Sequence, residues 1–240
     1  MNDCHACETQ PYRACVDKVP FFRNLSVEEK QHIAEAVIHK KFYRGEFLFS
    51  QGDILGSLLI VHTGSVKIFR LSATGKEQII RILGPGDFTG EYALFGANPS
   101  TNGAEALQAT EVCMIRGADM KRLILRYPNI AIKLLEEYAA ISAESESHIE
   151  QLSLFNVEQR LASLILRLGK HSCDDKVCEI TLPASKSNLA SFLGMTRETI
   201  SRKLSLFQEQ GWIELVNGRK IRILDVDSLQ KVVNSEPEAV

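Results

Sequence analysis

The first half of the chain alternates short apolar runs with turns that contain glycine. The runs cover residues 41–43, 46–49, 58–62, 65–70, 78–83 and 111–115. The turns between them hold Gly45, Gly52, Gly64, Gly75 and the pair Gly84 and Gly86. Short strands at this regular spacing predict an antiparallel, jelly-roll-like β-roll. We place this domain at residues 20–127, after an N-terminal arm of residues 1–19.

A helical period replaces this pattern in residues 128–155, which begin with a proline and contain no glycine. Positions suited to a helix–helix contact recur there at alternating spacings of four and three. They are Leu134, Tyr138, Ile141, Ser145, His148 and Leu152. This spacing is typical of the a/d seam of a coiled coil and predicts a homodimer interface. A helix buried against its own β-roll is the alternative interpretation.

Residues 184–207 hold two short helical patterns around a glycine. Gly194 interrupts the first pattern, residues 186–193, and Thr196 opens the second, residues 197–204. Two helices joined by a tight, glycine-containing turn form a helix-turn-helix, whose second helix enters the major groove of DNA. Because such proteins commonly read two half-sites, this motif favours the dimer interpretation of the long helix.

Two β-rich runs follow at residues 212–216 and 220–224, on either side of Asn217-Gly218. Asn-Gly between such runs is a strong hairpin signal, so we predict a winged helix-turn-helix at 156–232 and a tail at 233–240. The expected contacts to DNA lie on the second helix and the hairpin: Arg197, Glu198, Ser201, Arg202, Lys203, Arg219 and Lys220. Arginine pairs with guanine, and glutamate accepts from the cytosine amino group. A helical pair with a merely solvated charged face is the plainer alternative.

The distribution of charge supports double-stranded DNA as the partner, although the net charge of the chain is only −2. Residues 184–224 carry seven Lys or Arg against three Glu, a net charge of +4, which leaves −6 for the remainder. A locally basic domain on an acidic body suits phosphate contact. No apolar run approaches the ~18 residues of a membrane span. The first residues lack the basic flank and apolar core of a signal peptide, so we expect a cytoplasmic protein.

Several short motifs resemble, in their order along the chain, those of the CRP/FNR family of transcription regulators. They are Val19-Pro20-Phe21-Phe22, Gly45-Glu46, Gly52-Asp53, Gly64-Ser65-Val66-Lys67, 84–88, Gly90-Glu91 and 197–202. The resemblance implies an α+β fold with a β-roll sensor, a dimerisation helix and a winged helix-turn-helix. It also implies RNA polymerase as a partner. We do not expect an enzyme, because Ser, His and Asp residues are present but no catalytic constellation stands out among them.

The segment after Gly90-Glu91 argues against one ligand of this family. Relatives that bind cyclic nucleotides hold the phosphate with Gly-Glu and a nearby Arg-Ser or Arg-Thr. Residues 96–103 contain no Lys or Arg here, and a phosphate buried without a cation is costly. We therefore do not expect a cyclic nucleotide, and Gly90-Glu91 is interpreted as a structural turn.

Four of the six cysteines point to a different signal. Cys4, Cys7 and Cys15 have the spacing C-x2-C-x7-C in the arm, and Cys113 lies in a predicted strand of the β-roll. The arrangement resembles the oxygen-sensing FNR branch, in which three arm cysteines and one later cysteine hold a 4Fe–4S cluster. Four thiolates are the ligand count that such a cluster needs. The resemblance thus implies Cys4, Cys7, Cys15 and Cys113 as metal ligands.

Other interpretations of these cysteines remain open. They include a thiol–disulfide switch between Cys113 and Cys4 or Cys7, a structural zinc site, and an arm whose cysteines have no role. A sensor whose β-roll binds another small ligand is a further alternative. His5 is expected to be a solvated histidine. The remaining cysteines, Cys173 and Cys178, are expected to be free thiols without a role.

The sequence therefore predicts a homodimeric transcription regulator whose operator affinity follows an oxygen- or redox-sensitive 4Fe–4S cluster. Glu198, Ser201 and Arg202 match the FNR-type reading set, which is similar to half-sites of the form TTGAT. Arg197 matches CRP-type readers of TGTGA. The shared TGA core is the expected half-site.

Overall fold

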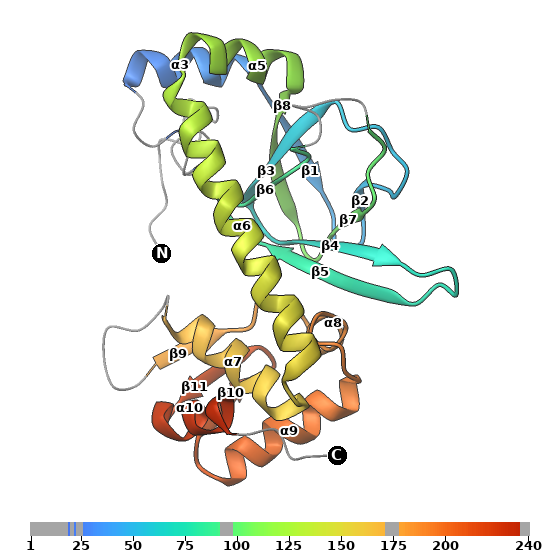
Figure 1. Ribbon diagram of the computed structural model, residues 1–240, viewed down its shortest axis with the longest axis vertical. Helices are drawn as coiled ribbons and strands as arrows, with labels where there is room; N and C mark the ends of the chain where they lie inside the picture. Colours follow the sequence, from blue (N-terminus) through green and yellow to red (C-terminus); the bar gives the residue numbers. More distant parts are fainter. Residues whose placement is uncertain (1–18, 20–21, 23–25, 92–97, 171–177, 236–240) are drawn as a thin grey trace. The chain divides into compact units, whose positions relative to one another are not determined.

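The computed structural model describes residues 19, 22, 26–91, 98–170 and 178–235 of the chain (Figure 1). These residues fall into two compact units. The first ends at Ser142 and the second begins at Ala143, with residues 77–79 counted in the second. No helix in the described ranges is long and apolar enough to cross a membrane.

The first unit is the β-roll that the sequence predicts. After α3 (Val27–Ala36), its strands are β1 (Val37–Phe42), β2 (Phe47–Phe49), β3 (Ser57–Thr63), β4 (Val66–Leu71), β5 (Glu77–Leu83), β6 (Phe88–Thr89), β7 (Gly103–Ala106) and β8 (Thr110–Arg116). They form two four-stranded sheets, with the orders β1-β8-β3-β6 and β2-β7-β4-β5. The turn after β3 requires a glycine: Gly64 has a φ of +92°, and a Cβ there would lie 2.4 Å from Thr110 Oγ1.

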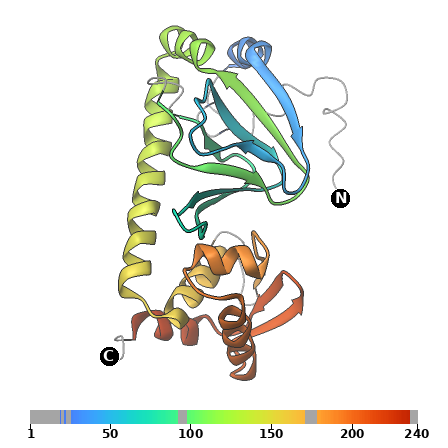
Figure 2. The ribbon, with the colours of Figure 1, turned by 90° about the vertical axis from the view of Figure 1, so that its right-hand side faces the viewer.

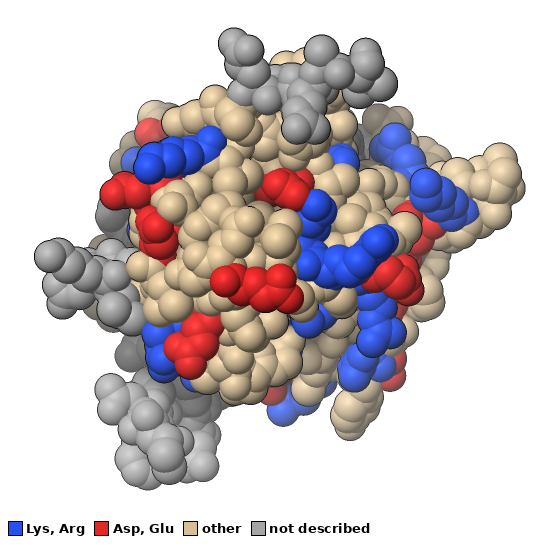
Figure 3. All heavy atoms as spheres, turned by 90° about the horizontal axis from the view of Figure 1, so that it is seen from below, with Lys and Arg blue, Asp and Glu red and all other residues tan. Residues whose placement is uncertain are grey.

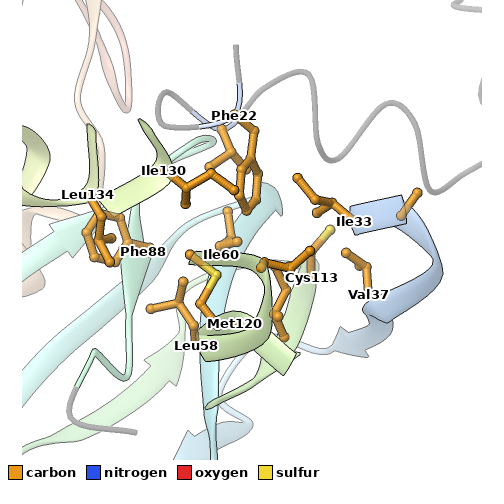
Figure 4. Packing of buried hydrophobic residues seen from close by; sticks show 14 residues of the cluster. Phe22, Ile33, Val37, Leu58, Ile60, Phe88, Cys113, Met120, Ile130 and Leu134 are labelled. Atoms are coloured by element: carbon orange, nitrogen blue, oxygen red, sulfur yellow. The ribbon is translucent and has the colours of Figure 1, made fainter. Parts of the chain in front are cut away.

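Strand β8 belongs to two hydrophobic cores, because successive side chains of a strand point to opposite faces. Val112 lies in a cluster with Val61, Val66 and Ala104. Its neighbour Cys113 lies in the other cluster, with residues of α3, β1, β3 and the helices that follow β8 (Figure 4). Each large apolar side chain buried in this way contributes about 1.5–3 kcal/mol. Cys113 is thus part of the core of its unit.

Two helices follow β8: α5 (Gly117–Arg126) and α6 (Asn129–Leu154). Ile130 and Leu134 anchor the start of α6 in the cluster that contains Cys113, and Ile141 packs against the same cluster. One stripe of the long helix is therefore buried on its own chain. Leu135, Tyr138 and Ile149 remain exposed along the same helix.

The second unit is a winged helix-turn-helix (Figure 2). Its elements are α7 (Val157–Lys170), β9 (Cys178–Thr181), α8 (Lys186–Phe192), α9 (Arg197–Glu209), β10 (Ile213–Asn217), β11 (Lys220–Ile223) and α10 (Val226–Asn234). The strands form a sheet of order β10-β11-β9. The predicted hairpin of β10 and β11 forms, but Asn217 pairs with Lys220, so the turn residues are Gly218 and Arg219, one position after the predicted Asn217-Gly218. The predicted fold class is thereby confirmed.

Within the second unit, the end of α6 is joined to α8 by a stacked pair of rings. The rings of His148 and Phe192 lie 4.2 Å apart at an interplanar angle of 9°. His148 Nε2 is buried and finds no hydrogen-bond partner among the described residues. Burial, reinforced by the positive charges of Arg167 and Arg160, holds the pKa of His148 below its usual value. The hydrogen bond to the Phe192 backbone and the charge of Glu144 oppose this effect without reversing it.

The lowered pKa of His148 predicts that the stability of this unit falls in weak acid. The unfolded histidine takes up a proton below about pH 6.5, whereas the folded His148 resists protonation. Its contribution is fully present above that pH and is lost as the pH falls through the folded pKa. His148→Phe keeps a ring on Phe192 but does not titrate. We expect the drop in Tm between pH 7.5 and 5.5 to be smaller in this variant than in wild type.

The matched control is His32→Gln, because His32 is exposed on α3 in the other unit. This variant should show the full wild-type drop in Tm. Equal drops in wild type and His148→Phe would show that His148 is not the titrating group.

Candidate nucleic-acid interface and cysteine site

The geometry of α8 and α9 is set by two side-chain caps and one glycine. Ser185 caps α8 by accepting a hydrogen bond from the Asn188 backbone N–H, and Thr196 caps α9 by accepting from that of Thr199. Gly194 makes the turn between the helices with a φ of +64°. That conformation favours glycine. The helix-turn-helix is thus specified by short-range chemistry.

The buried stripe of α9 determines which side chains point outward. Ile200, Leu204 and Phe207 are buried, at helical spacing. Arg197, Glu198 and Arg202 are exposed, whereas the neighbouring Ser201 and Lys203 are half-buried. The predicted base-reading residues therefore lie away from the core, on a surface that a major groove can accept.

Two of the predicted DNA contacts, Glu198 and Lys203, are charged side chains with polar partners in their own unit. The backbone N–H of Glu198 and then the Thr196 hydroxyl hold the pKa of the Glu198 carboxyl below its usual value. Glu198 is therefore ionised at neutral pH and can accept from a cytosine amino group. Lys203 forms an ion pair with Glu158 of α7. Lys203 must exchange that partner to reach a phosphate.

The cations of the hairpin differ in their partners. Arg219 is exposed at the turn and has no ion pair with any residue that the structure describes. Lys220 Nζ lies 2.6 Å from Glu179 Oε1 on the adjacent strand β9. Arg222, whose side chain is half-buried, pairs with Glu214 and with Glu179. Sequence reasoning missed these pairs because Glu179 is 41 residues from Lys220 in the chain.

The predicted seam of α6 is divided between buried and exposed positions. Leu134 lies in the core of the first unit, and Ile141 packs against it. His148 stacks on Phe192, and Leu152 lies so close to Gly194 that a Cβ there would meet its Cδ2 at 3.1 Å. Tyr138 is exposed, and Ser145 is half-buried. Four of the six predicted seam residues thus contact their own chain.

A second set of α6 residues also follows a heptad pattern, and it includes exposed positions of the helix. It differs from the predicted seam because every second member is shifted by one residue. Leu135, Ser142 and Ile149 are exposed at a spacing of seven, where the prediction had Leu134, Ile141 and His148. Both sets fit a heptad pattern, so the sequence alone does not separate them. The residue types could have separated the two sets, because histidine is a poor residue for a coiled-coil seam whereas isoleucine, as at Ile149, is a good one.

Cys113 is the one predicted metal ligand within the described residues. It is wholly buried on β8, opposite His39 on β1 and Ile60 on β3. Its Sγ lies 3.9 Å from His39 Nδ1. Burial lowers the pKa of His39, while the charge of Glu111 acts in the opposite direction. The imidazole beside the sulfur is thus favoured in its neutral form.

Cys113 is disulfide-bonded, and its partner is not among the described residues. Cys178, which we expected as a free thiol, is also disulfide-bonded to a partner outside them. Cys4, His5, Cys7, Cys15 and Cys173 all lie outside the described residues. Within the ranges that are described, no three His, Cys, Asp or Glu side chains gather to hold a metal ion.

Comparison with known proteins identifies the domain family of each unit. The sequence model of the cyclic nucleotide-binding domain matches residues 39–127, and that of the Crp-like helix-turn-helix domain matches residues 159–232. The probable transcriptional regulator flp of Lacticaseibacillus casei is 34% identical over 90% of this chain and 97% of its own. The fumarate and nitrate reduction regulatory protein of Salmonella typhi is 30% identical over 88% of this chain and 84% of its own.

A solved structure supports the fold. FixK2 from Bradyrhizobium japonicum superposes with a TM-score of 0.73 at 23% identity, covering 85% of this chain and 99% of its own. Together with the exposed polar face of α9 and the extended similarity to regulators, these findings identify the chain: it belongs to the CRP/FNR family of DNA-binding transcription regulators.

Proposed function

We propose that this regulator is a cytoplasmic homodimer whose affinity for palindromic operators follows the redox state of Cys113 and the cysteines of the N-terminal arm. The observation that carries the proposal is the disulfide at Cys113. The sulfur that takes part in it is fixed in the hydrophobic core of the first unit. As a transcription regulator, the bound dimer would act on RNA polymerase.

The form of the redox group that the sequence favours is a 4Fe–4S cluster held by Cys4, Cys7, Cys15 and Cys113. Names of relatives support an oxygen signal, because they include an anaerobic regulatory protein of Haemophilus influenzae that is 31% identical. The described part of the site fits one of the four ligands: the sulfur of Cys113 is buried among apolar side chains, which would shield a bound group from solvent. When bound, a cluster supplies a centre that oxygen can oxidise.

The disulfide itself favours a second form, a switch between thiols and a disulfide. This form needs Cys113 and a single arm cysteine. Two thiols lose two electrons and two protons to an oxidant, and one S–S bond forms. In both forms a flexible segment is tied to the rigid core at Cys113.

We do not include a cyclic nucleotide in the proposal, although residues 39–127 match that domain. The cluster between the sheets is filled by apolar side chains, among them Phe42, Phe49 and Leu83. Residues 96–103 hold no cation. An anionic phosphate would therefore lack its usual partner.

For the operator, we propose base contacts from Arg197, Glu198, Ser201 and Arg202 to half-sites with a TGA core. We assign phosphate contacts to Lys203, Arg219 and Lys220. The exposure of Arg197, Glu198 and Arg202 beside the buried stripe of α9 supports this assignment.

For the dimer, we propose that the contact face of α6 is its exposed stripe. Its exposed members are Leu135, Tyr138, Ser142 and Ile149, and the half-buried Ser145 and Leu152 lie at its edge. The spacing again alternates between three and four, as a two-stranded seam requires. The exposed fractions of Leu135 and Ile149, 64% and 63%, support a second copy as the partner of this stripe.

Arg202→Ala should lower the affinity for a matched operator by about 1–3 kcal/mol, because a bidentate base contact is lost. Affinity for a scrambled duplex should change little. Titration of both duplexes at one salt concentration measures the difference. Arg44→Ala, an exposed arginine in the first unit, removes the same charge and serves as the control. An unchanged ratio of the two affinities in Arg202→Ala would place Arg202 outside the groove.

Ile149→Glu should convert the dimer to monomers, since each copy loses about 1.5–3 kcal/mol of apolar burial and two carboxylates face each other. The side chain is exposed, so the fold of the single chain should be retained. Sedimentation equilibrium measures the change. Ala140→Glu adds the same charge on the opposite, exposed side of α6 and should remain dimeric. Dimeric Ile149→Glu would exclude this stripe as the interface.

Cys15→Ser separates the two forms of the redox group. If one of the four ligands is removed, one iron of the cluster is exposed to solvent. The iron content, the sulfide content and the operator binding of protein prepared without air should then be lost together. A switch between Cys113 and Cys4 or Cys7 should keep its redox response in this variant. Cys178→Ser, in the other unit, is the control and should keep the wild-type iron and sulfide content, and a melting curve verifies that the unit remains folded without this disulfide. Iron-free wild-type protein that binds its operator in reductant would contradict the cluster form and leave the dithiol form.

A further inference from the structure

The outer face of the wing carries a row of charged side chains across its three strands. In the register of the sheet, Arg222 on β11 stands directly opposite Glu214 on β10 and Glu179 on β9. Arg222 is thus flanked by two carboxylates: it is ion-paired with Glu214, and its Nη2 lies 3.8 Å from Glu179 Oε2. Figure 3 shows Lys and Arg beside Asp and Glu on the face of the molecule seen from below.

Glu179 binds a second cation on the same face. Lys220 Nζ lies 2.6 Å from Glu179 Oε1, while Ile221 and Ile223 point to the other, buried face of β11. The hydrogen bond from Lys220 lowers the pKa of Glu179, so the carboxylate is ionised at neutral pH. One glutamate therefore contacts both strand cations of the wing.

A carboxylate and a phosphate offer lysine and arginine the same kind of anionic oxygen. A phosphate that approaches Lys220 must replace Glu179 as the partner, and one that approaches Arg222 must replace Glu214 as well as Glu179. By contrast, Arg219 at the hairpin turn has no carboxylate partner within the described part of the chain and can contact a phosphate without such an exchange.

We propose that Glu179 acts as an internal competitor of DNA phosphates, which limits the sequence-independent affinity that the wing contributes. Non-specific binding depends almost entirely on phosphate contacts. Restraint of two cations therefore weakens binding to random DNA, while the base-reading side chains of α9 are untouched. The inference rests on DNA binding alone and is independent of the redox group.

The test is the affinity of full-length Glu179→Gln for a scrambled duplex, measured over a range of salt concentrations. Glutamine keeps the size of the side chain and an accepting oxygen but removes the charge. We expect the affinity to rise about two- to fivefold, the range set by measured exposed ion pairs. The slope of log affinity against log salt should steepen by about 0.9 for each cation released.

The control is Glu136→Gln, which removes an equal charge from an exposed glutamate on α6, paired with Lys133. It should leave both the affinity and the slope near the wild-type values. Equal behaviour of the two variants would overturn the proposal, because the effect would then be one of net charge alone. Melting curves of both variants verify that the wing remains folded.

A double-mutant cycle tests the specific pair. Lys220→Ala should lower the affinity for the scrambled duplex by a larger factor in the Glu179→Gln background than in wild type, because the freed lysine then contacts phosphate. The same factor in both backgrounds would contradict a competition between Glu179 and DNA for Lys220.

Discussion

The burial of one stripe of α6 on its own chain is the interaction on which the rest of the structure depends. At the start of the helix, Ile130 and Leu134 lie in the same core as Cys113. At its end, His148 and Leu152 contact Phe192 and the Gly194 turn of the helix-turn-helix. The start of α6 is thus packed in the core of the first unit, and its end is packed within the second unit. The neighbouring stripe, with Leu135, Ser142 and Ile149, remains exposed on the single chain.

This arrangement gives the proposed signal a physical route. Cys113 does not lie on a surface loop, where a change in its partner would be absorbed locally. It lies on a central strand, packed among the side chains that seat α6, and close-packed cores transmit strain because they contain few voids. In the proposed mechanism, a change in what Cys113 binds would therefore act directly on the side chains that hold the start of α6. The stacked His148–Phe192 pair is the corresponding contact at the other end.

Much of this fold follows from local sequence signals. Glycine turns, the hairpin beside Asn217-Gly218 and the capped helices around Gly194 each act over a few residues, and each forms within a residue of where the sequence predicts it. The contacts between residues far apart in the chain do not follow from local signals. The heptad pattern of α6 does not predict that Leu134 packs in the β-roll core. The sequence around Lys220 likewise does not predict its ion pair with Glu179. Such pairings are set by sheet register and helix docking, which the local pattern does not encode.

The central claim is that oxidation at the cysteines controls DNA affinity. The most direct measurement is a titration of a palindromic TGA-containing operator with wild-type protein prepared without air, repeated on the same sample after exposure to air. The account predicts a steep loss of affinity for the operator after exposure, with little change for a scrambled duplex. Identical operator affinity before and after exposure would contradict it.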